Sequence, residues 1–294
     1  MNLKWLLQSS GLISTHYSEL FNILQRQGYN VKDFGLISPR NLTNLENILE
    51  PDDFYIIRGG TRLLTILNDV QNISDCNEFL SDEQINNSDY YLSALKSGID
   101  YNIEKFDQFY YKDLGLPLLN STSEYIEFNE CKDLKFSENM FIKPSKDLKS
   151  FNGGILEKGT SIKDYILSGQ YQKAYQDEII ILDKVKNINT EYRFFCIKDE
   201  VISGSLYRRN SEPSLSNIIP EYVLSHAKEF VKLYQPADIF VMDLCKLSNG
   251  NIRIVEYNCW NCSGFYNTDI NKIVNEISNY KKGLKWKKYL RLEL

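Results

Sequence analysis

The sequence predicts a mixed α/β and α+β fold, in which a small open α/β domain precedes a larger domain of antiparallel strands. Before about residue 90, strand-like and helical segments alternate, which is typical of an open sheet with helices packed on it. After about residue 140, strand-like runs follow one another with turn residues between them, which is typical of antiparallel hairpins. We therefore expect two domains, residues 1–124 with a helical connector at its end and residues 125–294.

The first domain begins with alternating strand and helix signals. A short strand is expected over residues 3–8, and apolar residues at helical spacing follow it until Gly28, which ends the helix. A second extended piece lies near Val31, and residues 54–58 form a third before a Gly-Gly turn and a helix that Thr61 caps. This order predicts an open α/β sheet.

Arg58, Gly59 and Gly60 follow the third of these strands. Open α/β sheets bind ligands outside the carboxyl ends of their strands, so this turn is a candidate ligand site. The alternative is a tight turn with an exposed arginine. Residues from about 75 to 125 are polar and rich in tyrosine, and we interpret them as helices and connecting loops.

The second domain has strand-like runs that two helical segments interrupt, at residues 161–169 and 219–234. The expected strands are residues 141–144, 178–185, 191–199, 200–209, 238–247 and 251–259. Residues 279–294 carry six basic side chains and one acidic one. We interpret this segment as a solvated helix end, with contact to a polyanion as the alternative.

Asn249 and Gly250 lie between the last two strands. An Asn-Gly pair flanked by apolar runs favours a two-residue type I′ turn. Such a turn pairs Leu247 with Ile252, and this pair sets the register of both strands.

Counted from that turn, Asp243 lies directly opposite Glu256, and Asn258 projects from the same face two residues further on. Two opposed carboxylates repel each other, so we expect a cation between them. Mg²⁺ prefers oxygen ligands and commonly binds one or two carboxylates together with phosphate oxygens. The sequence therefore predicts a magnesium site at these three residues. The alternative is a different register, with the acids on opposite faces or in solvent.

A phosphate site is expected near residue 150. Lys143 lies near a strand end, Lys146 and Lys149 follow it, and Gly153 and Gly154 form a glycine-rich turn. Backbone amides in such a turn approach phosphate oxygens closely, and a lysine adds a point charge. The alternative is an ordinary hairpin turn.

Further charged residues lie on the two longest strands. Glu191 and Arg193 are two residues apart, which places them on one face of their strand. Tyr207, Arg208 and Arg209 close the next strand. An arginine on such a face can bind a phosphate or a substrate carboxylate with two parallel hydrogen bonds.

Composition excludes several classes of protein. The net charge of −5 and the isoelectric point near 5.3 argue against nucleic-acid binding over the whole surface, though not against a local basic patch. Apolar runs are too short for a membrane span or a signal peptide, so we expect a cytoplasmic protein.

Six cysteines follow no disulfide framework, and a cytoplasmic chain keeps them reduced. Cys259 and Cys262 have the spacing of a redox or zinc pair, but the sequence has no second pair of this kind and its two histidines lie far away. A structural role is the main interpretation, with redox and metal roles as alternatives.

The order of these motifs resembles the ATP-grasp superfamily, and most resembles small ATP-grasp domain proteins of bacteria and phages. The resemblance covers roughly residues 125–280 and is carried by FIKPSKDLKSFNGG, EYRFFCIKDEVISGSLYRR and VMDLCKLSNGNIRIVEYNCWNCSGFY. It implies an ATP-grasp fold of two α+β subdomains that hold ATP, preceded by a small α/β domain.

The resemblance also implies roles for individual residues. Lys143 would contact the nucleotide phosphates, and Lys149 with Gly153 and Gly154 would cover them. The remaining implied roles fall into four groups: Asp183, Lys184 and Val185 at adenine and ribose; Glu191 and Arg193 at the nucleotide or acyl phosphate; Asp243, Glu256 and Asn258 as ligands of Mg²⁺; Asn261, Ser263 and Gly264 beside the transferred phosphate. The superfamily implies no role for Cys259 or Cys262.

The activity that the resemblance implies is ATP- and Mg²⁺-dependent ligation of a carboxylate to an amine through an acyl phosphate, with release of ADP and phosphate. Arg193, Arg208 and Asn258 are the candidate catalytic residues, and small-molecule carboxylates and amines are the expected substrates. One alternative is a nucleotide-binding regulatory module without ligase activity. Another is a ligase that modifies a nucleic acid or a protein. The sequence leaves the substrates and the oligomeric state open.

Overall fold

The computed structural model describes residues 2–9, 14–33, 54–60, 98, 102–146, 150–169 and 178–292. The chain divides into two compact units, Met1–Tyr101 with Cys259–Leu294, and Asn102–Asn258. A contact-based unit need not coincide with a folding domain, so the division into residues 1–124 and 125–294 stays a prediction.

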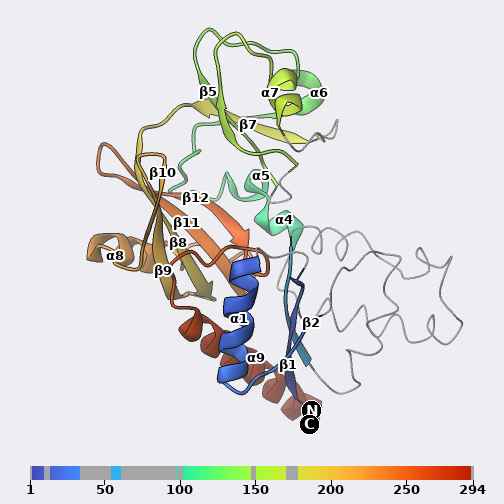
Figure 1. Ribbon diagram of the computed structural model, residues 1–294. Coiled ribbons are helices and arrows are strands. Elements are labelled where there is room, and N and C mark those ends of the chain that lie inside the picture. Colours follow the sequence, from blue (N-terminus) through green and yellow to red (C-terminus); the bar gives the residue numbers. More distant parts are fainter. Residues whose placement is uncertain are drawn as a thin grey trace, which may run out of the picture. The chain divides into compact units, whose positions relative to one another are not determined.

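The first unit contains a three-stranded parallel sheet in the order β2-β1-β3 (Figure 1). Its elements are β1 (Leu3–Leu7), α1 (Ser14–Arg26), β2 (Asn30–Asp33), β3 (Phe54–Arg58) and α9 (Ile270–Leu292). The predicted open α/β sheet is confirmed, and α9 contains most of the predicted C-terminal helix. The helix expected after Thr61 lies outside the described residues.

Trp5 is the central core residue of this unit. It is fully buried on β1, where its Nε1 donates to Ser278 Oγ on α9 at 3.2 Å. Its ring meets Trp260 edge to face, with 6.0 Å between the ring centroids. Residues from both ends of the chain therefore share one core, which the apolar run of β1 provides.

The second unit contains a four-stranded antiparallel sheet in the order β4-β7-β5-β6 (Figure 1). The elements of this part are β4 (Glu124–Glu127), α6 (Phe128–Cys131), β5 (Met140–Pro144), β6 (Gly154–Leu156), α7 (Ile162–Ser168) and β7 (Ile179–Lys184). Ser161 caps α7 by accepting from Asp164 N at 3.1 Å.

The two faces of this sheet differ in character. Ile142 on β5 pairs with Leu182 on β7, and both pack into one apolar cluster with Ile162 of α7. Successive side chains alternate between faces, so the next pair, Lys143 and Ile181, projects from the opposite face. Lys143 therefore points away from the helices, on the face that is left for a site.

The second unit also contains a five-stranded antiparallel sheet in the order β10-β9-β8-β11-β12 (Figure 1). Its strands are β8 (Ile188–Ile197), β9 (Glu200–Arg209), β10 (Glu212–Ser216), β11 (Ile239–Leu247) and β12 (Ile252–Cys259), and the helices of this part are α4 (Ile103–Phe106), α5 (Gln108–Tyr111) and α8 (Glu221–Phe230). The predicted antiparallel α+β character is confirmed.

Short elements escaped the sequence analysis. β4, β6 and α6 have three or four residues each, too few to show a period. β10 contains Pro213, and proline in a strand is tolerated at a sheet edge, where β10 lies. No helix among the described residues is long and apolar enough to cross a membrane.

Candidate functional site

The centre of the candidate site is a buried ion pair between two neighbouring strands. Asp243 on β11 and Arg193 on β8 are direct cross-strand partners. Arg193 Nε donates to Asp243 Oδ1 at 2.9 Å and its Nη2 donates to Oδ2 at 2.7 Å. Both side chains are almost fully buried. The guanidinium thus fixes the carboxylate in one orientation.

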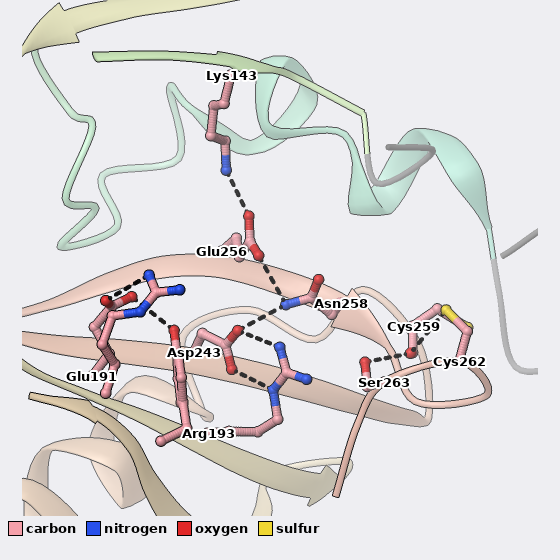
Figure 2. A network of polar contacts seen from close by, with 11 residues as sticks. Lys143, Glu191, Arg193, Asp243, Glu256, Asn258, Cys259, Cys262 and Ser263 are labelled. Atoms are coloured by element: carbon pink, nitrogen blue, oxygen red, sulfur yellow. Dashed lines mark hydrogen bonds and ion pairs between the residues drawn. The ribbon is translucent and has the colours of Figure 1, made fainter. Parts of the chain in front are cut away.

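Asn258 and Glu256 on β12 complete the acidic cluster (Figure 2). Asn258 Nδ2 lies 3.1 Å from Asp243 Oδ2 and 3.3 Å from Glu256 Oε1. The two carboxylates therefore converge on one atom. The sequence prediction that these three side chains gather on one face is confirmed by this geometry, while their role as magnesium ligands stays a prediction.

Glu256 is met by a lysine from the other sheet of the same unit. Lys143 on β5 reaches Glu256 Oε2 with its Nζ at 2.8 Å, as Figure 2 shows. The lysine side chain is 10% exposed and the glutamate side chain 35% exposed. The carboxylate is thus the solvent-facing partner, and the lysine brings positive charge to the acidic cluster.

A second carboxylate cluster lies beside the first. Glu191 on β8 accepts from Tyr207 Oη at 2.8 Å and from Arg208 Nη1 at 3.1 Å. Sequence reasoning had placed Glu191 and Arg208 in the site but not Tyr207. The acidic residues Glu191, Asp243 and Glu256 are each paired with one cation, Arg208, Arg193 and Lys143 respectively.

These neighbours shift the ionisation of the acids. Burial raises the pKa of Glu256, but the charge and hydrogen bond of Lys143 outweigh it, with smaller help from Arg193, and the pKa falls to about 2. Burial raises the pKa of Asp243 above its usual value, and repulsion from Glu256 adds to this, while Arg193 opposes it. Glu256 is therefore the more firmly ionised of the two acids.

Glu256 is expected to make an acid-sensitive contribution to stability. Its pKa is lowered from 4.5 to about 2 on folding, so the contribution is complete above about pH 4.5 and is lost as the pH falls through about 2. The melting temperatures of wild type and Glu256→Gln should converge as the pH is lowered over this range. Asp243 titrates in both proteins and does not affect the comparison. A difference that stays constant with pH would contradict this account.

The turn between β11 and β12 differs from the prediction. Leu247 N donates to Asn251 O and Gly250 N donates to Leu247 O, each at 2.9 Å, so the loop comprises residues 248–250. Only Gly250 in this loop has a positive φ, of 87°, whereas a type I′ turn needs two such residues. The predicted type I′ turn is therefore wrong. Asn249 instead accepts from Asn251 N at 3.1 Å through its side chain, which stabilises the longer loop.

The acids converge despite this change of register. Strict counting from the observed turn would place Val255, not Glu256, opposite Asp243. However, the buried positions on β12 change parity, from Ile252 and Ile254 to Tyr257. This change indicates an irregularity in the strand, which returns Glu256 to the face of Asp243.

Gly153 is required by a close approach rather than by its backbone angles. A Cβ on Gly153 would lie 2.8 Å from Lys143 Cβ, too close for two carbon atoms. A Cβ on Gly154 would lie 2.5 Å from Tyr165 Oη. Lys146 is half-buried. Lys149 lies outside the described residues, so the predicted covering of phosphate by Lys149, Gly153 and Gly154 stays a prediction.

Substituting Gly153 with Ala should displace Lys143 and lower the stability of the chain by roughly 1–3 kcal/mol, the usual cost of overpacking. Gly283→Ala in α9 is the matched control, because a Cβ there meets nothing within 4 Å. It should leave the melting temperature unchanged or raise it slightly. Equal melting temperatures for Gly153→Ala and wild type would contradict the proposed close contact.

The linker residues Asp183, Lys184 and Val185 follow the middle of β7. Asp183 is buried, accepts from Ser123 Oγ and Lys186 Nζ at 2.5 Å each, and accepts from Lys184 N at 2.8 Å. Its carboxylate is therefore engaged within the protein. Lys184 and Val185 are exposed. A role for this segment at adenine and ribose stays a prediction.

The turn at Arg58 is packed inside the first unit. Arg58 is 2% exposed and donates to the backbone carbonyls of Trp260 and Ser263, with its guanidinium carbon 3.9 Å from the centroid of the Phe265 ring. The expectation of an exposed arginine is wrong, because these carbonyls and the aromatic ring replace water around the charge. Gly59 N donates to Asn261 O at 3.0 Å.

The segment after β12 is held by its own side chains. Asn261 Nδ2 donates to Ile57 O, and Ser263 Oγ donates to Cys259 O at 2.7 Å. Cys259 is buried, Cys262 is partly exposed, and both are free thiols. Within the residues that the structure describes, no group of three or more His, Cys, Asp or Glu side chains is arranged to hold a metal ion. A zinc site at this pair is therefore not supported.

The fold and the site together define the class of protein. One antiparallel sheet carries a lysine, and a second carries an acidic pair followed by asparagine, as in the ATP-grasp fold. A sequence model of an ATP-grasp domain, the second family of its clade, matches residues 122–275. The chain belongs to this ATP-grasp family.

Solved structures agree with the fold. D-alanine–D-alanine ligase from Bacillus anthracis aligns with a TM-score of 0.53 and 14% identity, over 95% of this chain and 93% of that chain. D-cycloserine synthetase DcsG aligns with a TM-score of 0.50 and 10% identity, over 90% and 93%. The ATP-grasp ligase PsnB, complexed with a phosphomimetic precursor variant, Mg and ADP, aligns with 0.50 and 13%, over 93% and 96%. A comparison with curated proteins gave no match.

Proposed function

We propose that the protein is an ATP- and Mg²⁺-dependent ligase that joins a carboxylate to an amine through an acyl phosphate and releases ADP and phosphate. The observation that carries the proposal is the convergence of Asp243 and Glu256 on Asn258, with Lys143 bound to Glu256. Membership of the ATP-grasp family supports it. So do the ligase names of the similar structures, one of which contains Mg and ADP.

The residues present fit a magnesium ion. Asp243 Oδ2 and Glu256 Oε1 both lie within hydrogen-bond distance of one atom, Asn258 Nδ2. Rotation of that amide would present its oxygen instead, giving three oxygen donors of the kind Mg²⁺ prefers. These three residues would hold the ion, which when bound neutralises phosphate charge and orients the nucleotide.

The charges of the site favour a nucleotide that arrives with its metal. Three carboxylates face three cations, in the pairs of Glu256 with Lys143, Asp243 with Arg193, and Glu191 with Arg208. The cluster is thus neutral without a ligand. A metal ion alone would add unbalanced positive charge, and a triphosphate alone would add negative charge, so the two together disturb the balance least.

The residues then divide the chemistry between them. Lys143 supplies positive charge to phosphate oxygens, and Arg193 holds Asp243 in place. Arg208 orients the substrate carboxylate and stabilises negative charge on the transferred phosphoryl group. The carboxylate oxygen bonds to the γ-phosphorus as the bond to ADP breaks. The amine then bonds to the acyl carbon, phosphate leaves, and the amine loses its proton.

This reaction can be tested by trapping the acyl phosphate. The protein is incubated with Mg·ATP, hydroxylamine and a panel of carboxylic acids that includes amino acids, hydroxy acids and peptides. We expect one class of acid to give a hydroxamate and ADP in equal amounts. Nucleotide binding with no hydroxamate from any acid would favour the regulatory module. ADP release that does not depend on an acid would contradict the ligase.

The acceptor is proposed to be a small-molecule amine, with a protein or nucleic acid as the alternative. Repeating the assay with the amine in place of hydroxylamine distinguishes these cases, because only a macromolecular acceptor gains mass on ligation. Binding to RNA or DNA that falls steeply with salt would favour the nucleic acid.

A further inference from the structure

A β-bulge in β9 brings two consecutive side chains to one carboxylate. Glu191 on β8 pairs with Arg208, but the next residue, Tyr192, pairs with Leu206, so Tyr207 is an extra residue opposite Glu191. In a regular strand Tyr207 and Arg208 would point to opposite faces. The bulge turns both toward Glu191, whose carboxylate accepts from Tyr207 at 2.8 Å and from Arg208 at 3.1 Å.

The tyrosine lies between two guanidinium groups. Its ring centroid is 5.7 Å from the guanidinium carbon of Arg193 and 5.8 Å from that of Arg208. Burial raises the pKa of Tyr207, and repulsion from Asp243 and Glu191 raises it further, so the phenol stays protonated and donates. Tyr207 therefore has two contacts with the charged cluster, one through its hydroxyl and one through its ring.

The two arginines differ in exposure. The Arg193 side chain is 11% exposed and binds Asp243 with two hydrogen bonds, whereas the Arg208 side chain is 48% exposed. A buried arginine with both arms on one carboxylate acts as a support. A half-exposed guanidinium presents N–H groups to solvent, where a planar oxyanion can reach them. Arg208 is thus the cation that can meet a substrate.

We propose that Tyr207 is a positioning residue: its hydroxyl fixes the Glu191 carboxylate, which in turn holds Arg208 as the receptor for the phosphoryl or carboxylate oxyanion. The proposal rests on the proposed function and adds a residue to it. Without the hydroxyl, Glu191 loses one of its two donors and can rotate, and Arg208 follows it. Tyr207 itself contacts no substrate.

Inorganic phosphate, a product of the proposed reaction, is the probe. Calorimetry gives the affinity of the full-length chain for Mg·ADP, and then for phosphate at saturating Mg·ADP. Tyr207→Phe should leave the affinity for Mg·ADP within about twofold and weaken phosphate binding about tenfold, the loss typical of one displaced charge-assisted contact. Arg208→Lys, which keeps the charge but loses the planar arrangement of donors, should weaken phosphate binding similarly.

Tyr222→Phe is the matched control. Tyr222 is 45% exposed on α8, where its hydroxyl accepts from Lys246 Nζ at 3.0 Å. It should change neither affinity. If Tyr207→Phe binds phosphate as wild type does, or loses Mg·ADP and phosphate binding together, the positioning role is wrong.

The wild type separates the two levels of the proposal. Binding of Mg·ADP without binding of phosphate overturns the role of Tyr207 and Arg208 and leaves the proposed function intact. Absence of Mg·ADP binding overturns the proposed function, and the positioning role falls with it.

Discussion

Replacing Glu256 with Gln is expected to abolish turnover and to weaken the binding of Mg·ADP by at least about 100-fold, beyond the loss usual for residues that only support a metal ligand. The substitution keeps the shape of the side chain but removes the charge that Lys143 and the predicted Mg²⁺ share. The rise in melting temperature that Mg·ADP gives to wild type should disappear in this variant, because binding to the native state is what raises it.

Glu200→Gln is the control for this prediction. Glu200 is an exposed acid at the start of β9, and its substitution makes the same change in charge and size. It should keep the full response to Mg·ADP. Circular dichroism should show the same fold for both variants and wild type. Full activity of Glu256→Gln would sink the assignment of Glu256 to the metal.

Replacing Arg193 with Met should cost about 3–5 kcal/mol of stability, the range for breaking a buried ion pair by removing one partner. The cost arises because Asp243 is 1% exposed and would keep its charge without the guanidinium. Thermal unfolding should show a fall in melting temperature on the order of 10 °C.

The deficit should depend on pH in a defined direction. Without Arg193, the pKa of Asp243 rises further above its unfolded value, so its charge destabilises the folded chain at neutral pH and ceases to do so as the pH falls. The gap between Arg193→Met and wild type should therefore narrow in mild acid. A gap that widens in mild acid would contradict the buried charge as its cause.

Two further variants check the mechanism of this loss. Arg193→Met combined with Asp243→Leu removes both charges and should recover much of the stability, but not the binding of Mg·ADP. Lys198→Met breaks the exposed pair with Asp238, whose side chains are 49% and 41% exposed, and should change stability by no more than about 1 kcal/mol.

The sequence predicted the long strands and the gathering of the site because both follow from local patterns. The apolar runs of β8, β9, β11 and β12 are eight to ten residues long, and turn residues separate them. Asp243, Glu256 and Asn258 stand out because polar residues in such runs need partners. Each of these signals lies within one strand or one hairpin.

The register of the last hairpin could not be obtained this way. The prediction assumed that Asn249 and Gly250 form the turn alone, and that the strands are regular. The structure has a longer loop, stabilised by the Asn249 side chain, and a change of parity along β12. Two departures from regularity offset each other, and neither leaves a mark in the residue pattern.

Contacts between distant segments were also beyond the sequence. The pair of Lys143 with Glu256 joins positions 113 residues apart, and Arg58 contacts a segment more than 200 residues away. Tyr207 escaped notice because its role depends on a bulge that shows in the register alone. A half-apolar tyrosine at a strand end is otherwise an ordinary packing residue.

Calorimetric titration of ADP into the wild-type protein, with Mg²⁺ and again with the metal removed by EDTA, tests the central claim most directly. If Asp243, Glu256 and Asn258 hold a metal that Lys143 complements, binding should be clear with Mg²⁺ and weakened at least about tenfold without it. Equal binding in both conditions would contradict the metal site. An absence of binding in both would contradict the nucleotide site itself.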